Sequence, residues 1–406
     1  MTLPLQGIRI IDFTIFEVGP AGTAFLADMG ADVIHVEQPG TGDPQRGLHH
    51  FMGQDISLPG GRNMSFEEHN RNKRGIVLDL KHPLGQEAMH RLVANSDVFV
   101  TNFRPKAVAK LRLDYDTLKQ HNERLIYAQA TGFGMRGPEA DSPSVDLVAQ
   151  ARSGLMLGSG EQDMPPIQVT VGIADRTSSL MLAFGILGAL VVRERLDIGQ
   201  QLDVSQLGSM LAVQAWTLTP PLFRNWEYPR ANRERAGNPL YNFYQCKDGR
   251  WLAFALFVGE RYWPDFCRAI GKPELVDDPK FHDERARNQH NEELIAILDE
   301  VFAIKTADEW YPILKERGDF LFSVVNSPLS VISDPQVLAN DYVVEWDHPT
   351  LGPIKFLGFP VRFSQTPASL RLPAPEFGQH TEEVLLEVAG YSWDDLGQLK
   401  ADGVIP

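Results

Sequence analysis

The sequence predicts an α/β fold, in which a Rossmann-like, doubly wound parallel sheet forms a large domain and a smaller α+β domain follows it. Three observations lead to this prediction. Apolar strand-like segments alternate with helical segments through residue 130, which is typical of parallel sheets with right-handed crossovers. The chain has 406 residues, which is long for a single hydrophobic core. Beyond residue 220 the alternation stops and a different pattern begins.

The first residues contain the parts of a βαβ unit. Residues 8–13 and 31–36 are apolar strands, and the helix expected between them at 21–29 ends at Gly30. Further along, the same alternation predicts strands at 75–80, 98–103 and 125–130 and helices at 83–94 and 115–121. The polar, Gly- and Pro-containing stretch 40–67 is expected to form a loop over an active site. The apolar run 180–192 is shorter than the ~20 residues of a membrane span, so we expect a buried core helix there.

The domain boundaries follow changes in composition. Pro220-Pro221 and the aromatic, basic run 225–235 indicate a connector. We expect a large domain at 1–200, a linker at 201–235, a small domain at 236–325 and a C-terminal segment at 326–406 that returns to the large domain. The elements expected after the connector are a hairpin at 240–257, helices at 259–270, 291–301 and 307–316, a strand near 354–360 and a short helix at 381–388.

Composition limits the function. The net charge is -15, which disfavours general binding to nucleic acid or to anionic membranes. The two cysteines, Cys246 and Cys267, form no CxxC pair, and this usage fits a reducing cytoplasm. The first residues lack the basic and apolar regions of a secretory signal. We therefore expect a cytoplasmic protein that starts at this methionine, with no nucleic-acid or membrane partner.

Several common motifs are missing. The sequence contains no G-x-G-x-x-G dinucleotide fingerprint, Walker loop, H-E-x-x-H or G-x-S-x-G elbow, and its histidines are scattered, so we expect no metal site. Basic residues do gather at the ends of predicted strands, where open α/β sheets bind ligands. These residues are Arg71, Lys73, Arg74, Lys81, Arg104, Lys106 and Lys110. They predict a crevice for an anionic small ligand, although helix-end charges that complement dipoles explain part of the set.

Asp175 is the strongest candidate for chemistry. It ends the segment Thr170-Val171-Gly172-Ile173-Ala174-Asp175, directly before the apolar helix. A carboxylate in this place is either a helix N-cap or a positioned nucleophile. The surrounding residues alone leave both readings open.

A family resemblance favours the nucleophile. The motifs that carry it are residues 8–13, Gly19-Pro20, Gly30-Ala31-Asp32-Val33-Ile34, Glu37-Gln38-Pro39-Gly40, Asn72-Lys73-Arg74, Asn102-Phe103-Arg104-Pro105, Gly132-Phe133-Gly134 with Gly137-Pro138, and Asp175. Together they resemble the type III CoA-transferase family, which includes formyl-CoA:oxalate and crotonobetainyl-CoA:carnitine CoA-transferases and has α-methylacyl-CoA racemase as a relative. The resemblance spans nearly the whole chain and implies an interlocked homodimer.

The resemblance also implies a reaction. Asp175 would attack an acyl-CoA donor, pass through a mixed anhydride and an aspartyl-CoA thioester, and transfer CoA to a small carboxylic acid. CoA would be a substrate, and no tightly bound cofactor would be needed. The implied CoA-binding residues are Glu17, Val18, Gln38, Leu78, Lys81, Asn102, Phe103, Arg104, Lys110 and Asp146.

Some positions depart from the family pattern. Glu17 stands where the formyl transferase has Gln, Gln38 where an Arg often meets CoA, and Val145-Asp146 where racemases have a His-Asp pair. The glycine-rich loop that covers oxalate is replaced by residues 235–239, so oxalate is not the expected acceptor.

A racemase or epimerase and a non-catalytic CoA-binding protein stay as alternatives. The sequence does not specify which two acids are exchanged. One hypothesis is that the connector, with Trp226, Tyr228, Arg230, Arg233 and Arg235, supplies cations for a dicarboxylate or hydroxy acid.

Overall fold

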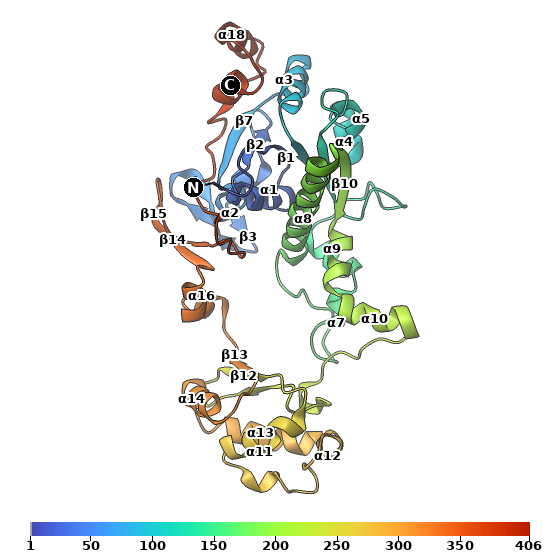
Figure 1. Ribbon diagram of the computed structural model, residues 1–406, viewed down its shortest axis with the longest axis vertical. Helices are drawn as coiled ribbons and strands as arrows, with labels where there is room; N and C mark the ends of the chain where they lie inside the picture. The colour runs from blue at the N-terminus through green and yellow to red at the C-terminus, as the bar shows by residue number, and fades with distance from the viewer. Residues whose placement is uncertain (1) are drawn as a thin grey trace. The chain divides into compact units, whose positions relative to one another are not determined.

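The computed structural model describes residues 2–406, which form two compact units. The first unit contains the residues through Met156 together with Gln168–Glu227 and Gln336–Pro406. The second contains Leu157–Ile167 and Tyr228–Pro335. The chain therefore enters the second unit twice and ends in the first, and Figure 1 lets the reader follow this path by colour.

A six-stranded parallel sheet forms the centre of the first unit. Its order is β10-β9-β8-β1-β2-β7, which read from β7 is the doubly wound 3-2-1-4-5-6 arrangement. The predicted Rossmann-like α/β sheet is thus confirmed. In register, Ile11 of β1 pairs with Ile34 of β2 on one side and Phe99 of β8 on the other. The strands are β1 (Arg9–Phe13), β2 (Asp32–Glu37), β7 (Lys73–Val77), β8 (Val98–Thr101), β9 (Ile126–Thr131) and β10 (Gln200–Ser205).

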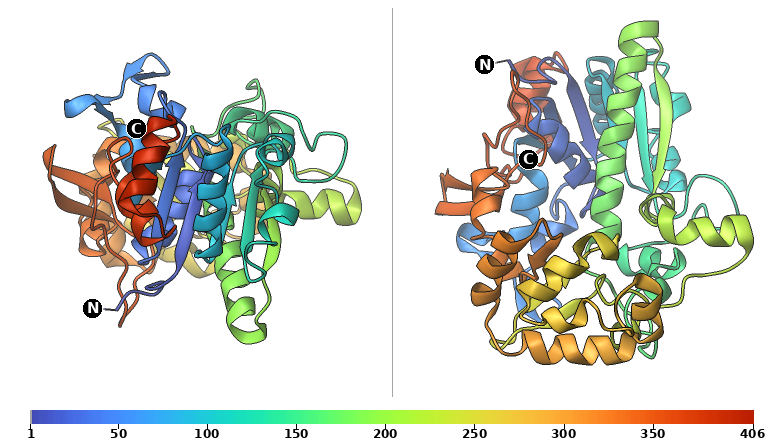
Figure 2. Two further views of the ribbon diagram at one scale, coloured as in Figure 1. Left: turned by 90° about the horizontal axis from the view of Figure 1, so that it is seen from above. Right: turned by 60° about the horizontal axis from the view of Figure 1, so that its bottom comes forward.

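Helices cover both faces of this sheet. On one face, α1 (Val18–Asp28) and α8 (Ile173–Leu196) pack together, and Leu26 and Leu182 join the strands in a buried core. Figure 2 shows the long α8 running alongside the strands. On the other face, α3 (Pro83–Ala94) packs with the C-terminal helices α17 (Thr381–Glu387) and α18 (Trp393–Ala401). Four short helices follow α3 along the chain: α4 (Pro105–Lys110), α5 (Tyr115–Leu118), α6 (Asp146–Arg152) and α7 (Leu155–Gly158).

Helix α1 begins earlier than expected, at Val18 instead of Ala21. The reason is that Gly19 lies in its first turn, directly over Thr14. A Cβ on Gly19 would lie 2.4 Å from the Thr14 Cβ, so only glycine lets the chain turn into the helix this soon after β1.

The segment expected as a loop over an active site contains several short elements. Asn63 caps its helix by accepting a hydrogen bond from the Phe66 N–H at 2.9 Å. These pieces are too short for periodicity to predict. They are η1 (Pro44–Gly47), β3 (His50–Phe51), β4 (Gln54–Asp55), β5 (Ser57–Leu58), η2 (Pro59–Gly61), β6 (Arg62–Asn63) and α2 (Met64–Asn70).

Helix α8 is longer and less buried than predicted. It buries Leu182 and Ile186 against the sheet, but Phe184 is 73% exposed and Val191 is 55% exposed. Only one side of the helix meets the sheet, so a uniformly apolar sequence leaves its other side uncovered. The next helices, α9 (Gln206–Val213) and α10 (Ala215–Arg224), expose apolar side chains as well.

The second unit contains a three-stranded antiparallel sheet of β11 (Phe243–Gln245), β12 (Trp251–Phe254) and β13 (Phe322–Val324). The expected hairpin is confirmed as the β11–β12 pair. Aromatic side chains fill the core between sheet and helices, including Trp263 and Trp310. Its helices are η3 (Arg233–Arg235), α11 (Gly259–Ala269), η4 (Pro273–Leu275), α12 (Glu284–Gln289), α13 (Asn291–Phe302), α14 (Ala307–Arg317) and α15 (Pro328–Val331).

After α16 (Pro335–Ala339), the returning segment forms the antiparallel hairpin β14 (Val343–His348) and β15 (Gly352–Leu357). Within residues 2–406, no helix combines the length and the apolar character needed to cross a bilayer. In the same part of the chain, no three His, Cys, Asp or Glu side chains are grouped as a metal ion would require.

Candidate active site

Asp175 lies in the first turn of α8, but it is not the N-cap. The cap position is Gly172, in the left-handed conformation with φ 76°, and it offers no side chain to the helix. Asp175 is the third residue of the helix and is half-buried. The N-cap interpretation is therefore wrong, because Gly172 lets the chain enter the helix three residues earlier. Asp175 is left at the positive end of the helix dipole without a capping role.

The capping role belongs to Asp146, at the start of α6. Its Oδ1 accepts a hydrogen bond from the Ala174 N–H at 2.7 Å, and its Oδ2 accepts one from the Gln150 side-chain amide at 2.7 Å. Gln150 in turn donates to the Thr170 carbonyl at 2.8 Å and accepts from the Val169 N–H at 3.1 Å. Two side chains of α6 therefore fix the backbone that leads into α8.

Gln206 contacts Asp175 directly. The side-chain amide of Gln206, the first residue of α9, donates a hydrogen bond to Asp175 Oδ1. Ser179 secures the same turn, since its hydroxyl lies 2.9 Å from both the Asp175 and the Val18 carbonyl oxygens. Gln206 was not predicted. Its one sequence signal is its place directly after a strand, at the edge of the sheet where α/β folds bind ligands.

The environment of Asp175 raises its pKa to about 6, first through burial and then through the nearby negative charge of Asp146. The hydrogen bond from Gln206 and the charge of Arg176 act in the opposite direction. At neutral pH most of the carboxylate is ionised, yet it is poorly solvated. A carboxylate in this condition is a better nucleophile than one fully hydrated in water.

Glu17 lies beside this carboxylate, in the turn before α1. Its Oε1 is 3.5 Å from Arg176 Nε and 3.7 Å from His69 Nε2. Burial raises the pKa of Glu17 to about 7, Arg176 opposes that rise, and the charge of Asp175 adds to it. Arg176 also donates from Nη2 to Glu68 Oε2 at 2.6 Å. Glu17, Glu68 and Arg176 therefore form one ion-pair cluster next to Asp175, and His69 contacts both carboxylates.

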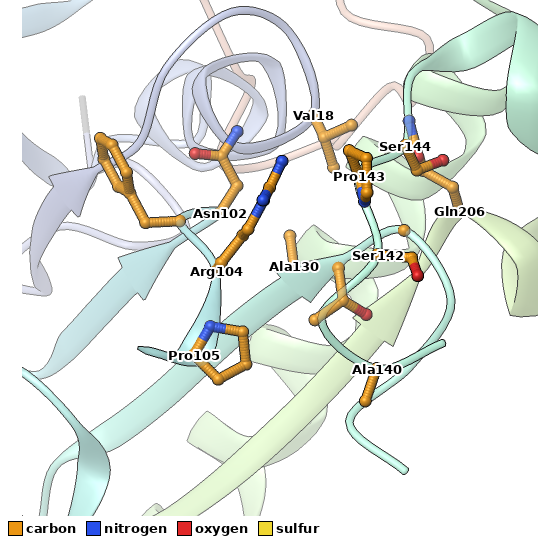
Figure 3. Close-up of a pocket in the computed structure, with 13 residues that line it drawn as sticks. Val18, Asn102, Arg104, Pro105, Ala130, Ala140, Ser142, Pro143, Ser144 and Gln206 are labelled. Carbon is orange, nitrogen blue, oxygen red and sulfur yellow. The ribbon is translucent and has the colours of Figure 1, made fainter. Parts of the chain in front are cut away.

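A pocket of about 180 Å³ opens at the carboxyl ends of β8 and β9. Four of the residues expected to bind CoA line it, namely Val18, Asn102, Phe103 and Arg104. Gln206 also lines it, so the pocket reaches the hydrogen-bond partner of Asp175. Figure 3 shows Asn102 and Arg104 on one side of this pocket and Ser144 and Gln206 on the other.

A second pocket, of about 300 Å³, lies at the carboxyl ends of β1, β2 and β7. Gln38, Leu78 and Lys81, which were also expected to bind CoA, line this pocket, and Phe103 lines both. Asn102 fixes the turn beside them, since its side chain accepts from the Ile15 N–H at 2.9 Å and donates to the Ile15 carbonyl at 2.7 Å. Both pockets lie along the sheet edge where α/β folds bind their ligands.

The other three expected CoA residues lie elsewhere. Glu17 and Asp146 are beside Asp175, as described above. Lys110 is exposed in the last turn of α4 and lines neither pocket.

The expected cluster of basic residues divides into two groups. Arg71, Lys73 and Arg74 are at the start of β7, where they form ion pairs with Asp28, Asp12 and Asp32 respectively. These three were wrongly assigned to an anion-binding crevice, because the amino end of a strand faces away from that edge of the sheet. Of the remaining basic residues, Lys81 and Arg104 line the two pockets.

Glu37, at the end of β2, is held by neighbouring groups of the protein. An acidic residue at the end of the second strand of a Rossmann fold usually binds a ribose. Here Arg46 donates to both Glu37 oxygens at 2.7 Å, and the Asp43 N–H donates to one of them at 2.9 Å. The Glu37 carboxylate is buried, and both of its oxygens accept hydrogen bonds from the protein.

Comparison with known proteins establishes the family. A sequence model described as CoA-transferase family III matches residues 5–381. The chain belongs to this family. It is 31% identical to the (R)-2-hydroxy-4-methylpentanoate CoA-transferase of Clostridioides difficile, over 99% of both chains. It is 32% identical to the succinyl-CoA:glutarate CoA-transferase of Mus musculus, over 99% of this chain and 90% of the relative.

The solved structures agree with this assignment. The crystal structure of a CAIB/BAIF family protein from Brucella suis is similar to this family III CoA-transferase with a TM-score of 0.84 and 29% identity. The match covers 96% of this chain and 100% of that chain. The protein is thus a family III CoA-transferase, an enzyme class that uses acyl-CoA as substrate and transfers CoA between acids.

Proposed function

We propose that this enzyme transfers CoA from an acyl-CoA donor to a small carboxylic acid through covalent intermediates on Asp175. The observation that carries the proposal is the place of Asp175. Its carboxylate is half-buried at the start of α8 and hydrogen-bonded to Gln206, which lines a pocket together with Asn102 and Arg104.

The first half of the reaction loads the enzyme. An Asp175 oxygen attacks the thioester carbonyl of the donor, and the C–S bond breaks to give a mixed anhydride and a CoA thiolate. The thiolate then attacks the carbonyl carbon of Asp175. The C–O bond of the anhydride breaks, the first acid leaves as a carboxylate, and an aspartyl-CoA thioester remains.

The second half is the reverse with a different acid. The acceptor carboxylate attacks the aspartyl thioester and expels the CoA thiolate, which forms a new mixed anhydride. Attack of the thiolate on the acceptor's acyl carbon then gives the new acyl-CoA and frees Asp175. One thioester is exchanged for another, so the route needs no metal and no external energy source.

The chain's own residues support these steps. The Gln206 amide and the positive end of α8 stabilise negative charge on the Asp175 oxygens. Asp146 and Gln150 hold the preceding backbone, which keeps the carboxylate in one orientation. We assign CoA binding to the two pockets, with Lys81 and Arg104 as partners for its phosphates and with Val18, Gln38, Leu78, Asn102 and Phe103 as further contacts. Glu17 and Asp146 would border the reacting end, and Lys110 would meet CoA at the rim.

A racemase is the weaker alternative. Moving an α-proton requires a base beside the substrate, and Val145 has no titratable group where racemases carry histidine. Both oxygens of Asp146 already accept hydrogen bonds from Ala174 and Gln150. A silent CoA-binding role is also disfavoured by membership in a family of transferases.

We further propose that the enzyme works as an interlocked homodimer in the cytoplasm. The dimer is supported by the apolar side chains that a single chain leaves exposed on α10, where Trp216 is 83% exposed and Leu222 and Phe223 are each 81% exposed. The location is supported by two buried cysteines, Cys246 and Cys267, that form no disulfide.

The decisive experiment traps the acyl-enzyme. The protein is incubated with a mixture of short acyl-CoAs and then with hydroxylamine, and its peptides are examined by mass spectrometry. We expect a hydroxamate at Asp175 that depends on acyl-CoA. The Asp175→Asn variant should fold, bind CoA and give no adduct and no exchange. Full exchange by that variant would rule out the covalent route.

A further inference from the structure

Arg176 is the cation nearest to the nucleophile in sequence, and its charge is already matched. Its Nη2 donates to Glu68 Oε2 at 2.6 Å and lies 3.2 Å from His69 Nε2, while its Nε lies 3.5 Å from Glu17 Oε1. Two carboxylates therefore share one guanidinium. A bound acid that brought a second carboxylate to this place would have to displace Glu17 or Glu68 from Arg176.

The neighbouring cations are engaged in the same way. Arg71 forms a buried pair with Asp28, through Nη2 at 2.7 Å, and its Nη1 lies 3.1 Å from Glu68 Oε1. Lys73 is fully buried and donates to Asp12 at 2.8 Å. Burial lowers the pKa of His69, despite its contact with Glu68, so this imidazole is neutral at pH 7. Arg71, Lys73 and Arg176 are thus all paired with carboxylates of the protein, while Arg104, which lines the first pocket, is assigned above to the phosphates of CoA.

The connector does not supply spare cations in the way one hypothesis required. Arg230 donates to the Ser159 carbonyl at 2.9 Å, Arg233 is paired with Asp299, and Arg235 lies 3.1 Å from Glu292. All of these partners belong to the second unit. The connector arginines therefore stabilise their own unit.

Glu17 itself is loosely held. The polar contacts of its carboxyl group, 3.5 Å to Arg176 and 3.7 Å to His69, are both longer than a strong charged hydrogen bond. Both of its oxygens lie 3.4 Å from the point where a Cβ on Gly172 would be, so the side chain rests over the open backbone before α8. The Glu17 carboxylate can therefore accept a hydrogen bond from an uncharged polar group of a bound acid.

We infer that the acids exchanged by this enzyme carry a single carboxylate with a hydroxyl group close to it, and that Glu17 selects them over dicarboxylates. This inference rests on the transferase function proposed above. The relatives include both kinds of acid, since one is named for a hydroxy monocarboxylate and another for the dicarboxylate glutarate. The inference assigns this enzyme to the first kind. Glu17 hydrogen-bonds the hydroxyl, and together with Glu68 it repels a second carboxylate.

The test compares acids of equal chain length. Butanoate, 2-hydroxybutanoate and succinate each have four carbons, and each is offered to the wild-type enzyme with butanoyl-CoA, 2-hydroxybutanoyl-CoA and succinyl-CoA as donors. We expect kcat/KM for 2-hydroxybutanoate to exceed that for succinate at least about tenfold, with butanoate between them. Glu17→Gln should reduce this ratio by about tenfold, because the amide removes the repelling charge. The matched control is Glu87→Gln on the exposed face of α3, which should leave the ratio unchanged.

The outcomes are distinct. Equal or faster transfer to succinate by the wild-type enzyme overturns the inference while the transferase function stands. An unchanged ratio in Glu17→Gln overturns the role of Glu17, since that measurement does not depend on how fast the variant turns over. No transfer from any donor to any acid, together with no adduct on Asp175, removes the proposed function itself.

Discussion

At the scale of single residues, the proposed mechanism requires Asp175 to act as a nucleophile at neutral pH. Burial and the charge of Asp146 raise the pKa of Asp175 to about 6, and the carboxylate must be ionised to attack. We therefore expect kcat/KM to fall about tenfold for each pH unit below 6 and to level off above 7. A pH–rate profile with one donor measures this. A flat profile down to pH 4.5 would contradict the raised pKa.

Gln206 should influence both the rate and that profile. Its hydrogen bond lowers the pKa of Asp175 and stabilises the negative charge on Oδ1. In Gln206→Ala we expect kcat to fall roughly 10- to 100-fold and the inflection of the pH profile to move to higher pH. Gln120→Ala, on an exposed glutamine of the same unit, is the matched control. A loss of rate with the same inflection in Gln206→Ala would mean that Gln206 acts only through packing.

The ionised carboxylate of Glu17 should lower the free energy of unfolding at neutral pH. Burial raises its pKa from 4.5 to about 7, so the folded protein binds this proton more tightly than the unfolded chain does. The free energy of unfolding therefore falls as the pH rises from 4.5 to 7 and stays low above that range. We expect Glu17→Gln to be more stable than the wild type by about 2 kcal/mol at pH 8 and nearly equal to it at pH 4. Denaturant unfolding at the two pH values measures the difference, and an equal effect at both would contradict the assignment.

At the scale of elements, the sheet was predictable and the start of α8 was not. Five of the six strands contain short apolar runs that local periodicity identified. The sixth, β10, alternates polar and apolar residues and lies largely in the segment expected as a linker at 201–235, so that part of the domain assignment was wrong. Asp175 looked like an N-cap because Asp favours that position. The actual cap is Gly172, and the turn that follows it is held by a hydrogen bond from the Ala174 N–H to Asp146, which is 28 residues away in the sequence. Contacts of this kind, and the one between Gln206 and Asp175, come from tertiary packing and leave no local pattern.

The attachment of α6 to α8 can be tested directly. Asp146→Ala removes the acceptor of the Ala174 N–H, and we expect the free energy of unfolding to fall by about 1–2 kcal/mol. The same change removes a negative charge that raises the pKa of Asp175, so the inflection of the pH–rate profile should move to lower pH. Asp114→Ala, which removes the N-cap of α5, is the control. It should cost similar stability and leave the inflection in place. An unmoved inflection in Asp146→Ala would contradict electrostatic coupling of the two aspartates.

At the scale of the whole molecule, an acidic chain has to bind an anionic substrate. The net charge is -15, yet the two pockets present Lys81 and Arg104 at the edge of the sheet. Arg71, Lys73 and Arg74 were misassigned, because they lie at the amino end of β7 and pair with aspartates there. In the proposed binding mode, CoA is held by a few local cations and by the apolar side chains around them.

The exposed apolar residues provide the last prediction. A single chain leaves Trp216, Leu222 and Phe223 on α10 almost fully in water, and Phe184 on α8 is 73% exposed. Such a surface is rare on a monomer and typical of an interface between subunits. We expect light scattering to give the mass of a dimer for the wild type, and Leu222→Glu to shift the protein toward monomers or aggregates, because a carboxylate would be buried without a partner. Lys119→Glu changes charge on the exposed end of α5 and should leave the dimer intact. A monomeric wild type that still transfers CoA would show that these side chains serve another purpose, and that one chain alone completes the active site.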